Sequence, residues 1–354
     1  MARADCYTTG AMQAVLFREH GGPDVLTAAS LPDPEISGQE VLIEVRAAAV
    51  NHLDIFLRRG LPGILLPLPH VPGSDAAGIV REPGPDVDPR LAVGTRVVVN
   101  PGISCGRCEF CTAGFGGQCE TYRIVGEHTQ GSYAELLKVP ADNLLPIPDD
   151  MSFEEAAASP LVFMTAWSMM VTKGRIRPGE DVLVLAAGSG VGTAAIQIAR
   201  LVGCRVFAAA GSDAKLERAR ELGAEVLINY RREAFDRVVR EHTGKRGVDV
   251  VIDHVGAETW AQSLRSARKG GRILTCGATS GHSPATDLRH VFYRQLQIIG
   301  STMGSPRDFG EVMRCVFRGQ LRPIVDRVLP LRDAAAAHRL IEERQVFGKL
   351  ILVP

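Results

Sequence analysis

Apolar and polar positions follow different patterns in the two halves of the chain. From residue 12 to about residue 160, short alternating or apolar stretches such as VLIEVRAAAV and RVVVN are interrupted by proline and glycine. This texture is typical of a mostly β domain with the character of a partly open barrel. Residues 1–11 precede MQAVLF, the first predicted strand, and we expect them to form a loose N-terminal extension.

The pattern changes near Met151. A helix is predicted over 152–171, with Ser152 as its N-cap and Glu155 completing a capping box. Apolar strands then alternate with helices, which predicts an α/β fold: a doubly wound parallel sheet with helices on both faces. The tail ends in KLILVP, a strand that could return to the first domain. Strands are expected at 182–187, 205–210, 225–230, 249–255, 272–277 and 296–301, and helices at 191–202, 213–222, 233–242 and 258–267.

Composition narrows the range of partners. A chain of 354 residues with 45% hydrophobic and 23% charged residues is ordinary for a soluble globular protein of about two domains. A formal net charge of +0 disfavours nucleic acid and anionic membrane surfaces as partners. The N-terminus lacks the apolar core of a signal peptide, and the uncharged run 182–199 contains three glycines, which disfavours a membrane span. We expect a cytoplasmic protein that acts on a small molecule.

Four of the eight cysteines lie within fifteen residues: Cys105, Cys108, Cys111 and Cys119. This spacing predicts a zinc cage, and four thiolates leave no open coordination position, as in structural sites. In such a glycine-rich loop the metal would supply most of the folding energy, on the order of 10 kcal/mol. Free thiols or disulfides are the alternatives. Cys6, Cys204, Cys276 and Cys315 are scattered along the chain.

The turn after the first strand of the alternating half is AAGSGVG, residues 186–192. Ala187 and Ser189 stand at the first two positions of the usual Gly-x-Gly-x-x-Gly pattern, so the motif alone is weak. A tight turn without a ligand is the alternative. Its place in the first strand–turn–helix unit favours dinucleotide binding, because a helix N-terminus there faces the pyrophosphate. The predicted binding residues are Gly188, Ser189, Gly190, Val191 and Gly192.

The end of the second strand favours NADPH over NADH. Ala210 stands where an NAD site would place a carboxylate, and Ser212 and Lys215 can donate to a 2′-phosphate. Asp213 opposes this assignment unless it serves as an N-terminal residue of the next helix. A solvated helix lysine is the alternative role for Lys215.

Together these residues resemble the medium-chain dehydrogenase/reductase superfamily over roughly residues 12–354. The resemblance is carried by HVPGSDAAGIV, VGTRVV, the four-cysteine lobe, EAAASPLVFMTAW, AAGSGVG, GSDAK, INY and GKLILVP. It implies a GroES-like catalytic domain formed by 12–160 and 302–354, with a zinc lobe at 100–120. Residues 161–301 would form the Rossmann cofactor-binding domain. It also implies a homodimer or homotetramer, paired through the sheet edge near LQIIGSTM.

The resemblance also implies further cofactor contacts. In the quinone-reductase branch, positions matching Gly211, Ser212, Lys215 and Tyr230 surround the 2′-phosphate of NADPH. The position of Lys349 approaches the cofactor phosphates. The remaining positions line the cofactor largely through backbone: His254, Val255, Cys276, Gly277, Ala278 and Thr302.

By the same resemblance, the catalytic zinc ligands of alcohol dehydrogenases are replaced by Asn51, Ser74 and Leu161, and the proton-relay hydroxyl by Leu53. A metal site rebuilt from other residues stays open: His52, Asp54, His70 and Asp75. Asn51 and Thr165 match residues near the nicotinamide, with a turn role and a helix-core role as their alternatives. His52, Asp54, His128, Tyr133 and solvent are candidate proton donors.

These features predict an NADPH-dependent oxidoreductase that transfers hydride to a conjugated carbonyl, because a zinc-free site cannot easily stabilise an alkoxide. A quinone, an enone or an enoyl thioester would be the acceptor. One alternative is an alcohol dehydrogenase with an unusual metal site. Another is a cofactor-binding protein with little turnover, such as a redox sensor.

Overall fold

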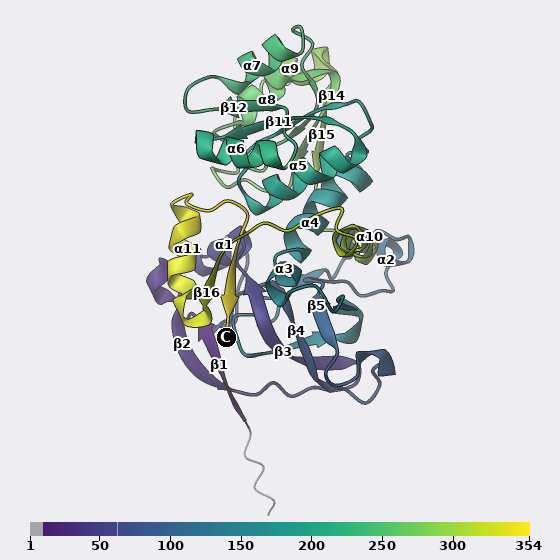
Figure 1. Cartoon of the computed structure of the whole chain (residues 1–354), viewed down its shortest axis with the longest axis vertical. Coiled ribbons are helices and arrows are strands. Elements are labelled where there is room, and N and C mark those ends of the chain that lie inside the picture. The colour runs from purple at the N-terminus through teal and green to yellow at the C-terminus, as the bar shows by residue number, and fades with distance from the viewer. Residues whose placement is uncertain (1–9, 62) are drawn as a thin grey trace, which may run out of the picture.

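A computed structural model describes residues 10–61 and 63–354 (Figure 1). The chain forms a six-stranded α/β unit and a β-rich unit, with α4 (Pro160–Trp167) and α10 (Pro306–Phe317) beside the junction. Cys6 and residues 1–9 of the predicted extension lie outside the described residues, and Ala11 already belongs to the first strand, β1 (Ala11–Leu16). No helix in the described ranges is long and apolar enough to cross a membrane.

The α/β unit contains the predicted doubly wound parallel sheet. Its strand order is β12-β11-β10-β13-β14-β15, so the first strand of the unit lies at the centre and the order reverses on either side of it. Ligands bind at such a switch point, outside the carboxyl ends of the strands. The strands are β10 (Asp181–Val184), β11 (Arg205–Ala210), β12 (Val226–Asn229), β13 (Val248–Ile252), β14 (Ala267–Thr275) and β15 (Gln297–Gly300).

Alternate residues of these strands enter two separate cores. On one face, Val182 and Val184 pack with α4, α10, α5 (Gly190–Val202) and α6 (Asp213–Glu221). On the other face, Leu183 and Phe207 pack with α7 (Phe235–His242) and α8 (Trp260–Ser266). A short helix, α9 (Leu288–Tyr293), precedes β15. Helices on both faces explain why the strands are almost continuously apolar.

The β-rich unit is built on a seven-stranded sheet in the order β16-β17-β3-β4-β5-β9, with β8 also paired to β3. The predicted return of the C-terminal strand is confirmed, because β17 pairs antiparallel with β3. Helix α11 (Ala334–Glu342) packs in this unit. The sheet strands are β3 (Glu40–Ala49), β4 (Asp75–Pro83), β5 (Arg96–Val99), β8 (Leu136–Pro140), β9 (Leu144–Pro146), β16 (Val325–Pro330) and β17 (Lys349–Val353).

Smaller elements complete this unit. Strand β1 pairs with β2 (Thr27–Pro32), and β6 (Gly102–Ile103) pairs with β7 (Arg123–Ile124). Two further α-helices of this unit are α1 (His52–Arg59) and α2 (Glu109–Thr112). The short 3-10 turns are η1 (Pro23–Val25), η2 (Pro89–Leu91), η3 (Gly116–Gln118), η4 (Ala141–Asn143) and η6 (Leu331–Asp333).

The helix predicted over 152–171 is wrong as one continuous element. It is divided into α3 (Phe153–Ala157), α4 and a π-helical turn, η5 (Ser168–Lys173). Pro160 begins α4, because it has no backbone N–H to donate and cannot continue α3. Ser152 is the N-cap of α3 and accepts from Glu155 N, but the Glu155 carboxylate contacts the Ser152 hydroxyl, so the reciprocal half of the capping box is absent.

Candidate cofactor cleft and metal site

The turn between β10 and α5 brings the start of the helix close to the end of the strand. Ala186 has a φ of 45°, and Ser189 is the N-cap of α5, accepting from Gly192 N at 3.0 Å. A Cβ at Gly192 would lie 2.4 Å from the Ala186 carbonyl oxygen, so only glycine permits this close approach of helix and strand. This geometry fits the predicted pyrophosphate site, because backbone N–H groups at the start of a helix attract anions.

The C-terminal strand of the β-rich unit reaches this turn. Gly348 N donates to Gly188 O at 2.9 Å, and Gly348 forms a bridge with Ser189. The Lys349 side chain then passes the helix start, since a Cβ at Gly190 would lie 3.0 Å from Lys349 Cδ. The two units thus meet at the turn of residues 186–192, and Lys349 lies beside it.

Lys349 ends in a buried polar network. Its ammonium donates to Asp75 Oδ2 at 3.1 Å and to Asn51 Oδ1. Asn51 Nδ2 donates to the same carboxylate oxygen at 2.9 Å, and Leu161 N donates to Asp75 Oδ1 at 2.9 Å. Because Asp75 is fully buried and Lys349 is only 4% exposed, each charge offsets the desolvation of the other. The network fixes the Asn51 side chain between a cation and an anion.

A second buried chain of contacts begins next to Asn51. Asp54 accepts from Asn51 N at 2.8 Å and from Tyr133 Oη at 3.1 Å, and Tyr133 Oη also contacts His338 Nε2 at 3.1 Å. Burial raises the pKa of Asp54 to about 7, and burial also lowers the pKa of His338 to about 3. Asp54 and Tyr133 are both fully buried, so neither can donate directly to a substrate in the cleft without a structural change.

Of the four residues proposed as proton donors, only His52 combines an exposed ring with a place beside the network. The residue is exposed to solvent, although the protein around it partly desolvates the ring. Desolvation, followed by the nearby charges of His254, Lys349 and Arg344, lowers the pKa of His52. His128 is tied by its Nδ1, which accepts from Ile124 N at 3.1 Å.

At the end of β11 the predicted 2′-phosphate residues come together with two arginines. Ser212 is the N-cap of α6, and a Cβ at Gly211 would lie 2.7 Å from Tyr230 Oη and 3.2 Å from Arg231 Nε. Lys215 Nζ donates to the Arg344 carbonyl at 2.6 Å. Desolvation lowers the pKa of Lys215. The negative charge of Asp326 raises this pKa, whereas the positive charges of Arg231, Arg344 and Arg218 lower it further.

The acidic residue next to this cluster is paired with polar side chains. Asp213 is the first residue of α6, accepts from Asn229 Nδ2 at 2.7 Å, and forms a salt bridge with Arg232 at 2.8 Å. These contacts offset part of its negative charge. Sequence reasoning missed Arg231 and Arg344. Arg231 directly follows the quoted INY, whereas nothing near Arg344 in the sequence marks it, because β17 and its preceding loop come from the other unit.

The residues predicted to line the cofactor lie beyond the carboxyl ends of β13, β14 and β15. His254 Nε2 contacts Ser189 Oγ at 3.0 Å, and His254 Nδ1 has no partner among the described residues. Thr275 Oγ1 donates to Gly277 O at 3.2 Å, and Ser280 N donates to Val255 O at 2.8 Å. Burial raises the pKa of Cys276 to about 12, so this thiol stays protonated. Ala278 follows Gly277 in the same loop, and Thr302 is exposed.

Thr165 has a packing position inside α4. It is only 5% exposed, and its hydroxyl lies 4.0 Å from Met303 Sδ. It thus contacts the segment that contains Thr302, which fits the helix-core alternative considered for this residue.

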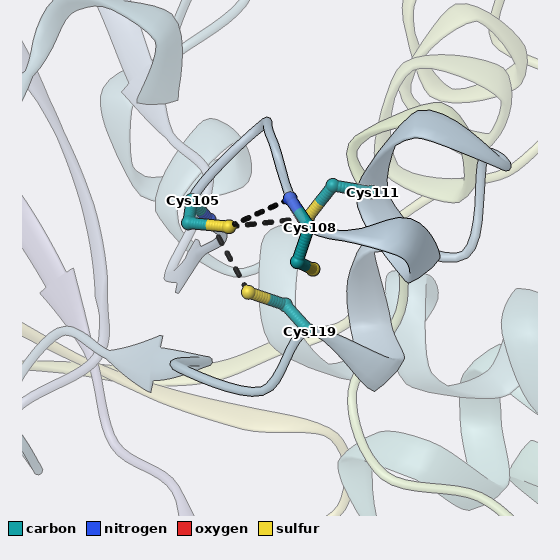
Figure 2. Close-up of side chains that lie close together, drawn as sticks. All are labelled: Cys105, Cys108, Cys111 and Cys119. Atoms are coloured by element: carbon teal, nitrogen blue, oxygen red, sulfur yellow. Dashed lines mark hydrogen bonds between the residues drawn. The ribbon is translucent and has the colours of Figure 1, made fainter.

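The four cysteines of the glycine-rich lobe converge (Figure 2). Their Sγ atoms all lie within 4.8 Å of one another, and Cys105 Sγ and Cys111 Sγ are 3.9 Å apart. Tetrahedral zinc with Zn–S bonds of about 2.3 Å requires sulfur–sulfur distances of about 3.8 Å, so the cage fits this ion. The N–H of Cys105 donates to Cys119 Sγ at 3.3 Å and lowers the pKa of that thiol to about 6. Zinc bound here would have four protein ligands.

The zinc lobe also packs against the segment that enters α10. Tyr122 Oη donates to Gly304 O at 3.1 Å. A Cβ at Gly117 would lie 3.1 Å from the Gly304 carbonyl carbon, and one at Gly116 would lie 2.8 Å from Pro306 Cδ. The lobe therefore supports the backbone immediately after Thr302.

Comparisons with known proteins agree with this geometry. Residues 37–149 match the family model of the alcohol dehydrogenase GroES-like domain, and residues 190–318 match the zinc-binding dehydrogenase model. An alcohol dehydrogenase from Geobacillus stearothermophilus is 31% identical over 96% of this chain and 99% of its own length. A quinone oxidoreductase from Salmonella typhimurium is 30% identical over 96% of this chain and 98% of its own length. The chain belongs to the medium-chain dehydrogenase/reductase superfamily.

This medium-chain dehydrogenase/reductase is similar to solved structures of both a dehydrogenase and a reductase. The structure of an NAD-dependent alcohol dehydrogenase has a TM-score of 0.93 and 51% identity, covering 97% of this chain and 100% of that one. A crotonyl-CoA carboxylase/reductase, AntE, in complex with NADP has a TM-score of 0.90 and 28% identity, covering 97% of this chain and 94% of that one. The predicted fold and family are confirmed, and the activity class is that of an NAD(P)H-dependent oxidoreductase.

Within the described residues of this medium-chain enzyme, the four-cysteine cage is the one cluster of three or more potential metal ligands. The alternative of a rebuilt site is not supported, because its candidate ligands His52, Asp54, His70 and Asp75 do not form such a cluster. Asp54 and Asp75 belong to the networks above, and His70 Nε2 contacts Gly126 O at 2.8 Å. At the positions of the lost ligands, Asn51 is bonded to Lys349, Ser74 Oγ is buried without a described partner, and Leu161 contributes its backbone N–H to Asp75.

Proposed function

We propose that the protein is an NADPH-dependent reductase that transfers hydride to a conjugated carbonyl compound without a catalytic zinc. Quinones and enones are the favoured hydride acceptors, and enoyl thioesters are the third candidate class. One observation carries the proposal: a hydrogen-bonded lysine, asparagine and aspartate occupy the region of the lost zinc ligands. This arrangement holds a positive charge in place but offers no set of metal ligands.

The cofactor preference rests on the charge at the end of β11. Gly211, Ser212, Lys215 and Tyr230 form the proposed site of a 2′-phosphate, together with Arg231 and Arg344. A dianionic phosphate would relieve the mutual repulsion of these cations, whereas the neutral ribose hydroxyl of NADH would not. The pyrophosphate would bind at Gly188–Gly192, and the nicotinamide would lie toward the ends of β13 and β14.

The chain's own residues support hydride transfer mainly by positioning and electrostatics. When bound, NADPH supplies the hydride, and a conjugated acceptor delocalises the arriving negative charge onto oxygen. The buried cation of Lys349, held by Asn51 and Asp75, would contribute a positive electrostatic potential that favours this negative charge. Solvent then supplies the proton, since Asp54 and Tyr133 are fully buried and a pKa lowered to about 4 leaves the His52 ring neutral. Zinc at Cys105, Cys108, Cys111 and Cys119 would stabilise the lobe.

The test is a comparison of two substrate panels. Purified protein is incubated with NADPH and quinones, enones and crotonyl-type thioesters, and separately with NADP or NAD and simple alcohols. We expect turnover on the conjugated panel, with about one zinc per chain by elemental analysis. Two zinc ions per chain, or alcohol oxidation sensitive to chelators without turnover on the conjugated panel, would overturn the proposal.

A second candidate function is the interconversion of an alcohol and an aldehyde. The structural similarity to an NAD-dependent alcohol dehydrogenase at 51% identity favours it. The same panels distinguish the two, because each reaction is measured with its own substrates, and chelators would inhibit alcohol oxidation that uses a metal as Lewis acid. Failure on both panels with retained NADPH binding would instead favour a cofactor-binding protein with little turnover.

A further inference from the structure

A hollow lined almost entirely by basic side chains lies on the α/β unit, at the edge of the sheet opposite the cofactor cleft. It is open to solvent, and its volume is about 560 Å³. It is formed where β13 and β14 begin, whereas the cofactor turn lies where the strands end. We name it the basic hollow, and its lining is Arg240, Lys245, Arg246, Arg265, Arg268, Lys269, His290 and Arg294.

The carboxylates near the basic hollow neutralise only part of its charge. Asp249 forms salt bridges with Arg246 and Arg268, and Asp236 with Arg265. Asp181, the third acid in contact, is shared between Arg246 and Arg205. Seven lysines and arginines therefore face three aspartates in a chain whose formal net charge is +0.

Arg294 is held in place without a counterion among the described residues. Its guanidinium donates to Leu264 O at 3.0 Å, to Arg265 O at 3.2 Å and to Ala267 O. Three carbonyls orient this half-buried group but do not cancel its charge. Desolvation lowers the pKa of Arg294, and the adjacent Arg240 lowers it further. No hydrogen bond from the side chains of Arg240, Lys245 or Lys269 is found within the described ranges, so these three remain available to a ligand.

We propose that the basic hollow binds a compact anion carrying two or more phosphate groups. Fixed guanidinium groups match phosphate oxygens in bidentate geometry, and several cations at close range favour a multiply charged ligand over a single carboxylate. Apart from His290, none of the described residues that line the hollow is aromatic, so it lacks the stacking surface that single-stranded nucleic acids use. The site is separate from the phosphate sites for NADPH and does not depend on the proposed reaction.

The test is calorimetric titration of pyrophosphate into the zinc-loaded protein with its cofactor site saturated by NADPH. We expect one saturable site per chain, weakened by added salt because the contacts are ionic. Arg240→Gln combined with Lys269→Gln should weaken pyrophosphate binding by roughly tenfold or more, since charge-assisted contacts are lost. Both side chains are exposed, so the double variant should fold and bind NADPH normally.

The matched control is Arg220→Gln combined with Arg307→Gln, which removes the same charge from exposed positions on α6 and α10. This control should leave the pyrophosphate affinity unchanged. Equal loss of pyrophosphate affinity in both double variants would show that the affinity depends on the overall charge of the protein rather than on the basic hollow. Loss of pyrophosphate binding on NADPH saturation would show that pyrophosphate binds in the cofactor cleft. Absence of saturable binding, or tighter binding of a short DNA duplex with the same variant dependence, would also overturn the proposal.

Discussion

At the scale of single residues, cofactor choice depends on Lys215 and the arginines around it. Lys215→Ala should reduce the preference for NADPH over NADH, because one charge-assisted contact contributes roughly 1.5–3 kcal/mol. Dissociation constants for both cofactors, measured by fluorescence titration, check this. Lys138→Ala is the control, since Lys138 pairs with Glu40 on the surface of the β-rich unit. Equal NADPH and NADH affinities in the unmodified protein would contradict the assignment.

The buried carboxyl of Asp54 should make stability depend on pH. Burial raises its pKa from 3.8 to about 7, so between these values the folded state holds a proton that the unfolded state releases. Stability from this group is therefore present below about pH 4 and decreases as pH rises toward 7, by at most about 1.4 kcal/mol for each unit. The lowered pKa of His338 makes stability increase with pH between about 3 and 6.5, so the contributions of the two residues must be separated.

Asp54→Asn isolates the contribution of Asp54. The variant keeps an oxygen that can accept from Asn51 N and Tyr133, but it has no charge to bury. Its stability relative to the unmodified protein should rise from about pH 4 to about pH 7 in denaturant unfolding. A stability difference that stays constant over this range would show that Asp54 titrates normally.

Sequence reasoning reached many of these residues but not their contacts. The spacing of the cysteines and the turn at 186–192 are local, so their geometry was predictable. Lys349 was expected at the cofactor phosphates and passes the start of α5, but its ammonium continues to Asn51 and Asp75. That partnership joins residues far apart in the chain, and Arg344 likewise comes from a distant segment. Such pairs follow from the packing of the two units rather than from any local pattern.

At the scale of elements, alternation of strands and helices was enough to predict the parallel sheet, since buried strands and amphipathic helices have different periods. The boundary between α3 and α4 was missed because apolar residues continue across Pro160. The packing of the zinc lobe on α10 was also unpredictable, because it depends on close backbone approaches at Gly116 and Gly117.

This packing gives the zinc lobe a measurable influence on the cofactor cleft. Tyr122→Phe removes the hydrogen bond to Gly304 O, at a cost of about 1 kcal/mol. The segment after Thr302 should become looser, so NADPH affinity should fall severalfold while zinc content stays at one per chain. Tyr293→Phe is the control, because Tyr293 is 72% exposed. Unchanged NADPH affinity in Tyr122→Phe would show that the packing of the lobe does not influence cofactor binding. A separate variant, Cys111→Ser, should lose the zinc itself.

At the scale of the whole molecule, the six-stranded sheet has an exposed edge at β15. Ile298 on this strand is 43% exposed, and α9 just before it exposes Leu288, Phe292 and Tyr293 by 60–72%. Apolar side chains beside an open strand edge favour pairing with a second copy. We therefore propose that two chains associate through β15, in line with the homodimer or homotetramer implied by the family resemblance.

The structure offers a matched pair of positions for testing this assembly. Val328 is 47% exposed on β16, the edge strand of the seven-stranded sheet, and so resembles Ile298 in residue type, exposure and location. A lysine at Ile298 would place a charge at the proposed contact, whereas the same substitution at Val328 would leave that contact intact. Light scattering coupled to size-exclusion chromatography should show smaller particles for Ile298→Lys and an unchanged mass for Val328→Lys. If Val328→Lys dissociates the assembly instead, the subunits associate through the β-rich unit, and a monomeric unmodified protein would rule out both edges.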